Sequence, residues 1–101
     1  MAENFGVVVI DENGRIIDYS VPTTMPYSLL KEAVSLSYDI YRTVKVITKE
    51  LGYSIPKNMT IKLDSYEVTI FKRYNRIVIV IIYEEAIKGS VKAVREAVVE
   101  S

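Results

Sequence analysis

One long helical segment, residues 26–51, constrains the fold most because apolar positions cover an unusually large part of its circumference. At about 100° per residue, the apolar side chains form two groups. The first group consists of Leu29, Ala33, Leu36, Ile40, Ile47 and Leu51. The second group, on the other side of the arc, consists of Tyr27, Leu30, Val34, Tyr38 and Tyr41. The two groups span roughly 200°, whereas a helix on one sheet needs a stripe of about 100° or slightly more. We therefore expect the second group to contact a second partner.

The composition indicates one folded domain, residues 1–101, and restricts its chemistry. The 13 basic and 13 acidic side chains cancel and are interspersed, which argues against nucleic acid as the main partner because phosphate binding needs concentrated positive charge. Half of the residues are apolar, which excludes disorder. The chain has no cysteine, so it forms no disulfide, thiolate or sulfur-ligated metal site.

The sequence predicts a soluble cytoplasmic protein without membrane insertion. Its longest apolar run, residues 77–83, suits one buried strand and is too short to cross a bilayer. Residues 1–4 are too short and too acidic for a signal peptide. The lack of Gln, Cys and His, with abundant Ile, Val, Tyr, Lys and Glu, is typical of a hyperthermophile, such as an archaeon.

The first half of the chain predicts two strands and the long helix. Residues 5–10 form an unbroken apolar run, typical of a strand buried on both faces, and residues 15–21 form the return strand. The Asn13-Gly14 pair between them tolerates positive φ and suits a tight hairpin. We expect Pro26 to be the first helical residue, with Thr24 or Met25 at the N-cap and Thr24 the better cap. Gly52 is expected to end the helix in the left-handed conformation.

Three strands and a second helix are predicted to follow. Residues 59–64 alternate strictly between apolar and polar, residues 66–73 alternate less cleanly, and residues 76–83 are apolar on both faces. We expect Asn75 to take the left-handed conformation in the turn between the last two strands. Apolar residues then recur at helical spacing: Ile87, Val91, Val94 and Val98.

These patterns predict an α+β sandwich of order ββαβββα, with a five-stranded antiparallel sheet and a helix on each face. The two doubly apolar strands belong in the middle, and tight turns pair consecutive strands, which gives the strand order 2-1-5-4-3. The edge strand at residues 59–64 contains no proline and only one lysine, so it is weakly protected against pairing with another chain. Beside a helix with surplus apolar surface, this edge forms a coherent dimerisation face.

This arrangement resembles the roadblock (dynein light chain) family of profilin-like and longin-like domains. The likeness rests on the apolar strand, acidic-glycine turn and second strand at residues 6–17, GVVVIDENGRII. The long helix, the three-strand meander and Gly89 at the start of the last helix also agree. Roadblock proteins usually have an extra helix before the first strand, but only four residues precede Phe5. We therefore expect a minimal form, close to a longin core, with one sheet face covered by the C-terminal helix alone.

The resemblance implies a scaffold or regulator of small Ras-like GTPases. It also implies a homodimer, or a heterodimer with a sister domain, in which the long helices and the third strands pair antiparallel. Carried over by position, the dimer residues are Leu30, Val34, Tyr38 and Tyr41 on the helix and Thr60, Lys62 and Asp64 on the strand. The helix residues belong to the second apolar group, which was assigned without reference to the family.

The sequence contains no pattern that indicates catalysis, a cofactor or a metal. Histidine and cysteine, the usual general base and thiol nucleophile, are absent. Asp11 and Glu12 lack the spacing of a calcium loop and suit a hairpin turn. Arg73 and Arg76 flank a turn, where they are ordinary surface charges or could donate an arginine to a GTPase.

Two other functions remain open at this stage. A monomeric longin-like adaptor would use the groove beside the helix to bind peptides or trafficking partners. A small-molecule sensor is suggested only by the profilin-like architecture, which hosts ligand-binding domains in other proteins.

Overall fold

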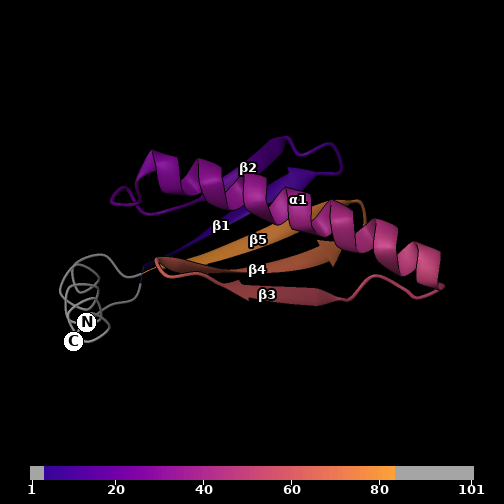
Figure 1. Ribbon diagram of the computed structural model, residues 1–101. Helices are drawn as coiled ribbons and strands as arrows, with labels where there is room; N and C mark the ends of the chain where they lie inside the picture. Colours follow the sequence, from indigo (N-terminus) through magenta and orange to yellow (C-terminus); the bar gives the residue numbers. More distant parts are fainter. Residues whose placement is uncertain (1–3, 84–101) are drawn as a thin grey trace, which may run out of the picture.

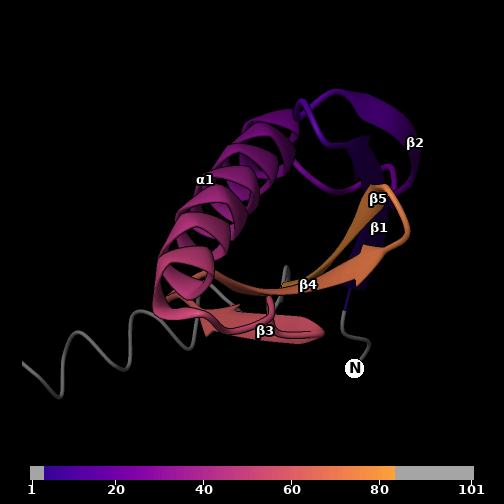
Figure 2. The same ribbon diagram turned by 90° about the vertical axis from the view of Figure 1, so that its right-hand side faces the viewer.

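The computed structural model describes residues 4–83, which form one helix lying diagonally across one face of a five-stranded sheet (Figures 1 and 2). The sheet has the order β2-β1-β5-β4-β3, and every neighbouring pair is antiparallel, as predicted. The elements are β1 (Asn4–Asp11), β2 (Ile16–Ser20), α1 (Tyr27–Leu51), β3 (Asn58–Lys62), β4 (Tyr66–Arg73) and β5 (Arg76–Tyr83). The predicted C-terminal helix lies outside the described residues.

The core lies between α1 and the sheet because alternate residues of the central strands point toward the helix. In β5 these residues are Ile77, Ile79 and Ile81, which are fully buried. Val8 and Ile10 of β1 and Val68 and Ile70 of β4 extend the same layer. Burial of Tyr66 beside this layer raises the pKa of its hydroxyl, and the negative charge of Glu32 adds to the shift. The doubly apolar strands therefore occupy the middle of the sheet, as predicted.

The end of α1 agrees with the prediction, but its beginning does not. Gly52 has φ 82°, and its N–H meets the carbonyl of Lys49. At the other end, Pro26 is the N-cap and has an extended conformation, with φ −63° and ψ 139°. The prediction of Thr24 as N-cap and Pro26 as first helical residue was wrong, because the fixed φ of proline is compatible with this extended cap. The Thr24 hydroxyl lies instead 3.5 Å from the Tyr83 hydroxyl.

Strand β3 ends two residues earlier than predicted. Asn58–Lys62 forms the strand, and the Leu63 N–H donates to the Tyr66 carbonyl across the following turn. The chain bends at Asp64 to enter β4, so Asp64 lies in the turn and not on the strand.

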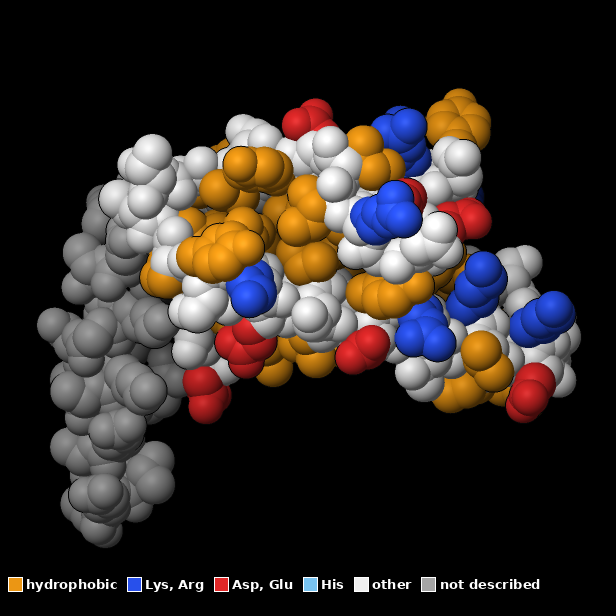
Figure 3. All heavy atoms as spheres, turned by 90° about the horizontal axis from the view of Figure 1, so that it is seen from above, with side chains coloured by type: hydrophobic (Ala, Val, Ile, Leu, Met, Phe, Trp, Pro, Cys, Tyr) orange, Lys and Arg blue, Asp and Glu red, His pale blue; other side chains and the backbone are white. Residues whose placement is uncertain are grey.

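The β1–β2 and β4–β5 turns lie at the same end of the sheet. Gly14 has φ 89°, as the Asn-Gly pair predicts, whereas in the β4–β5 turn Tyr74 has φ 57°. The expectation that Asn75 takes the left-handed conformation was therefore wrong. Most of the Lys and Arg side chains visible in Figure 3 lie toward this right-hand end, which also holds the C-terminal half of α1. No helix within the described residues is long and apolar enough to cross a membrane.

Candidate interaction surface

Three of the four helix residues predicted to form a dimer belong to the core of the protomer. Leu30, Val34 and Tyr41 are only 8%, 7% and 3% exposed. The buried face of α1 also takes Leu29 and Ala33 from the first apolar group and the fully buried Ser37, so it covers the adjoining parts of both groups. Leu30, Val34 and Tyr41 therefore have little surface left for a partner.

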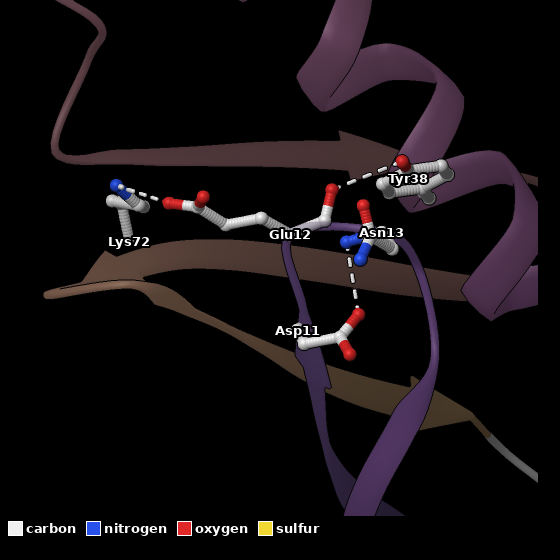
Figure 4. A network of polar contacts seen from close by, with 5 residues as sticks. All are labelled: Asp11, Glu12, Asn13, Tyr38 and Lys72. Carbon is white, nitrogen blue, oxygen red and sulfur yellow. Dashed lines mark hydrogen bonds and ion pairs between the residues drawn. The ribbon is translucent and has the colours of Figure 1, made fainter.

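The fourth residue, Tyr38, holds the β1–β2 turn against the helix (Figure 4). Its hydroxyl donates a 3.0 Å hydrogen bond to the Glu12 carbonyl. Its ring lies over Gly14, where an added Cβ would come within 3.0 Å of the ring. The Arg42 guanidinium lies 5.5 Å from the centre of the same ring. Tyr38 therefore has a structural role within one protomer.

The β1–β2 turn is also held by its own carboxylate. One Asp11 oxygen accepts hydrogen bonds from the N–H groups of Asn13 and Arg15, both at 2.9 Å. The bond from the Arg15 N–H contributes most to lowering the pKa of Asp11, because it favours the charged form. The neighbouring Glu12 forms a 3.7 Å ion pair with Lys72 of β4. The Asp11-Glu12 pair thus serves the hairpin turn, as the sequence suggested.

Apart from Tyr27, on the Tyr38 side, the exposed apolar residues of α1 lie in its last two turns and are Val46, Ile47 and Leu51. Ile47 is 49% exposed and follows Tyr38 by nine residues, which places it about 180° around the helix. Leu36 and Ile40, half-buried, lie on the same side, and Leu51 is 64% exposed near it. Because Tyr38 contacts the turn beside β2, the opposite flank faces the β3 edge of the sheet. We call Leu36, Ile40, Ile47 and Leu51 the β3-side flank.

The β3 edge presents backbone hydrogen-bonding groups next to this flank. The Leu63 N–H donates to the Tyr66 carbonyl, and hydrogen-bonded positions recur at every second residue of an antiparallel ladder. The backbone N–H and C=O groups of Met59 and Ile61 therefore point toward β4. The backbone groups of Thr60 and Lys62 then point away from β4, and among the described strands β3 pairs with β4 alone. The hydroxyls of Thr60 and Thr69 lie 3.1 Å apart across this ladder. Thr60 and Lys62 therefore sit where a strand-to-strand contact needs them, whereas Asp64 does not.

Sequence reasoning missed the β3-side flank because a helical wheel does not show which of two apolar groups faces the sheet. Ile47 and Leu51 follow the buried Leu29 and Ala33 by 18 residues, or five whole turns, so they share the angles of core residues and are exposed because they lie in the last two turns of α1.

The described residues provide no assembled metal site, and α1 carries a shallow depression on its surface. No three Asp or Glu side chains among residues 4–83 gather as ligands for a metal ion. An open depression on the outward side of α1 is lined by Asp39, Arg42, Thr43, Val46 and Ile47. A single helix forms it, so it does not bring groups from different elements together around a ligand.

The fold matches solved structures, although no protein-family model and no curated protein sequence matches the chain. A Roadblock/LC7 domain from Streptomyces avermitilis superimposes with a TM-score of 0.64 at 15% identity, covering 97% of this chain and 88% of that one. MglB of Myxococcus xanthus has a TM-score of 0.58 at 19% identity, covering 77% of this chain and 62% of that one. An MglB structure with a tetrameric arrangement has a TM-score of 0.59 at 13% identity, covering 91% of this chain and 71% of that one.

These similarities identify the class of structure. The chain has the roadblock fold, which confirms the resemblance found in the sequence at the level of the fold. The match spans less than two thirds of the Myxococcus xanthus MglB chain.

Proposed function

We propose that this protein is a non-catalytic dimeric scaffold or regulator of a small Ras-like GTPase. The observation that carries the proposal is the β3 edge, with free backbone groups at Thr60 and Lys62, beside an exposed apolar helix flank in a roadblock fold. The inference that the partner is a GTPase rests on the resemblance to roadblock proteins. The neighbours are roadblock or MglB proteins and indicate no enzyme family, which supports a non-catalytic role.

In the proposed dimer, β3 pairs antiparallel with β3 of a second copy, and the β3-side flanks of the two α1 helices pack together. Pairing over the full strand sets Thr60 opposite Thr60 of the second copy and Lys62 opposite Asn58, so no like charges meet. Of the interface residues predicted from the sequence, this dimer retains Thr60 and Lys62 on the strand. On the helix, the proposed interface residues are Leu36, Ile40, Ile47 and Leu51 in place of Leu30, Val34, Tyr38 and Tyr41. The tetrameric MglB neighbour supports self-association of this fold.

Sedimentation equilibrium over a concentration series tests the dimer. We expect the wild type to be dimeric and Ile47→Glu to weaken association at least about tenfold, because the ionised carboxylate would lose water in the interface. Tyr27→Glu is the matched control: Tyr27 is 71% exposed on the Tyr38 side of α1, so its variant remains dimeric. A wild type that stays monomeric at high concentration would contradict the dimer and favour the longin-like adaptor.

Binding to purified Ras-like GTPases from the same genome tests the partner. Each GTPase is loaded with GDP or a non-hydrolysable GTP analogue, and isothermal titration calorimetry measures its affinity for the protein. A regulator is expected to prefer one nucleotide state, because only differential affinity shifts a switch between its states. A dimer that binds none of these GTPases in either state would contradict the assigned partner while leaving the dimer intact.

A further inference from the structure

The β4–β5 turn, which lies at the right-hand end of the sheet in Figure 1, contains a tyrosine and is flanked by two arginines. Arg73 and Arg76 are directly opposite each other in the ladder, with Tyr74 and Asn75 between them. We call these four residues the β4–β5 tip. The tip is built entirely from exposed residues.

The backbone of the tip is strained at Tyr74. Its φ of 57° lies in the left-handed region, which is unfavourable for a bulky side chain and is better tolerated by glycine or asparagine. Asn75, the next residue, would tolerate a positive φ better, yet Tyr74 is the residue that adopts it. The Tyr74 side chain is 91% exposed, and so packing within the protomer does not offset the strain. Such strain without local compensation is typical of functional positions.

The two arginines add an electrostatic cost to the tip. Arg73 lies opposite Arg76, and like charges in this position are destabilising, whereas on its other side Arg76 lies opposite Asp11 of β1. The nearby carboxylates are already engaged, since Asp11 accepts backbone N–H groups and Glu12 pairs with Lys72. Within residues 4–83, neither Arg73 nor Arg76 forms an ion pair. The tip therefore presents two guanidinium groups without a carboxylate partner in that part of the chain.

We propose that the β4–β5 tip docks an acidic segment of a partner protein. Guanidinium groups bind carboxylates through paired hydrogen bonds, and exposed Tyr and Arg are the residues that most often dominate protein interfaces. Two arginines are too few to attract a membrane surface, which typically takes a cluster of about four to eight basic residues. Nucleic acid is disfavoured by the zero net charge of the chain. This proposal does not depend on the dimer or on a GTPase.

The probe is a capped peptide of alternating Glu and Ser, titrated into the isotopically labelled protein and followed by amide chemical shifts. We expect shifts centred on the tip and an affinity that falls with added salt. Arg73→Ala/Arg76→Ala is expected to weaken binding about tenfold. The charge-matched control Lys45→Ala/Lys49→Ala, on the exposed face of α1, is expected to change it less than about twofold.

Several results would overturn the proposal. Undetectable peptide binding, or equal weakening by the two double variants, would mean that the tip is no acidic-peptide site. Binding to phosphatidylserine vesicles that depends on Arg73 and Arg76, without peptide binding, would assign the tip to a membrane surface instead.

Tyr74→Gly tests the strain independently. We expect this variant to raise the melting temperature by several degrees, because glycine adopts positive φ without strain, and to weaken peptide binding several-fold. The matched control Asn75→Gly, at a residue without positive φ, gives no such rise. A lower melting temperature for Tyr74→Gly than for the wild type would contradict the view that stability is sacrificed at the tip for recognition.

Discussion

The two edges of the sheet have the same length but differ in how they resist pairing with another chain. Both β2 and β3 contain five residues. β2 is irregular, because its pairing with β1 shifts register between Val9 and Ile10, and it carries Asp18 in its middle. Bulges and charges within a strand protect an edge against pairing. β3 pairs regularly with β4 and has its only charge at its end, in Lys62.

Charge decides which edge suits a second copy of the chain. Antiparallel pairing of β2 with its copy over the whole strand sets Asp18 opposite Asp18, which repels. The same pairing of β3 sets Thr60 opposite Thr60. The apolar flank of α1 lies on the β3 side, whereas on the β2 side Tyr38 is engaged with the β1–β2 turn. In the proposed dimer, the edge that pairs is thus the one that lacks protection and lies beside the exposed apolar flank.

The largest effect is expected from Thr60→Pro, which removes the outward N–H at the centre of β3. Thr60 does not exchange backbone bonds with β4, so the protomer keeps its ladder. Sedimentation equilibrium is expected to show association at least about tenfold weaker, since both copies lose a central hydrogen bond. Thr60→Val keeps the N–H and is the control; a monomer in both variants would contradict the role of the backbone.

Asp18→Asn is expected to remove the protection of β2. The amide oxygen retains the acceptor for the Tyr19 N–H, now bonded at 2.8 Å, while the charge is lost. Sedimentation velocity should detect assemblies larger than dimers at high concentration, and Asp18→Glu should not form them. Unchanged assembly of Asp18→Asn would show that the bulge alone protects this edge.

Tyr38→Phe is expected to affect the β2 side without affecting the dimer. It removes the hydroxyl that donates to Glu12, which we expect to lower the free energy of unfolding by about 0.5–1.5 kcal/mol in urea denaturation. Weaker self-association of this variant, measured alongside, would contradict the assignment of the interface to the β3 side.

The smallest effect concerns the pH dependence of the β1–β2 turn. The pKa of Asp11 is lowered from 3.8 in the folded state, so its stabilising contribution is present above that value. The contribution is lost as pH falls below 3.8 and through the folded-state pKa. Melting temperatures of wild type and Asp11→Asn should therefore converge on acidification. A difference between the two melting temperatures that stays constant as the pH falls below 3.8 would contradict the lowered pKa of Asp11.

The sequence predicts the sheet order because each local pattern agrees with it: two doubly apolar strands, tight turns and one long helix. It does not predict local geometry where alternatives have similar energy. The N-cap at Pro26 and the left-handed Tyr74 are examples, since propensity favours Thr24 and Asn75. The outward backbone of Thr60 and Lys62 follows from strand alternation, whereas the exposure of Ile47 does not follow from helical spacing, because Ile47 has the same helical angle as the buried Leu29.

Hydrogen–deuterium exchange at several protein concentrations tests most directly whether two copies pair through β3. We predict that the Thr60 and Lys62 amides, which point away from β4, exchange slowly at high concentration and faster on dilution. The β2 amides, Ile16–Ser20, should show no dependence on concentration. Concentration-dependent protection in β2 with none in β3 would contradict the proposed dimer.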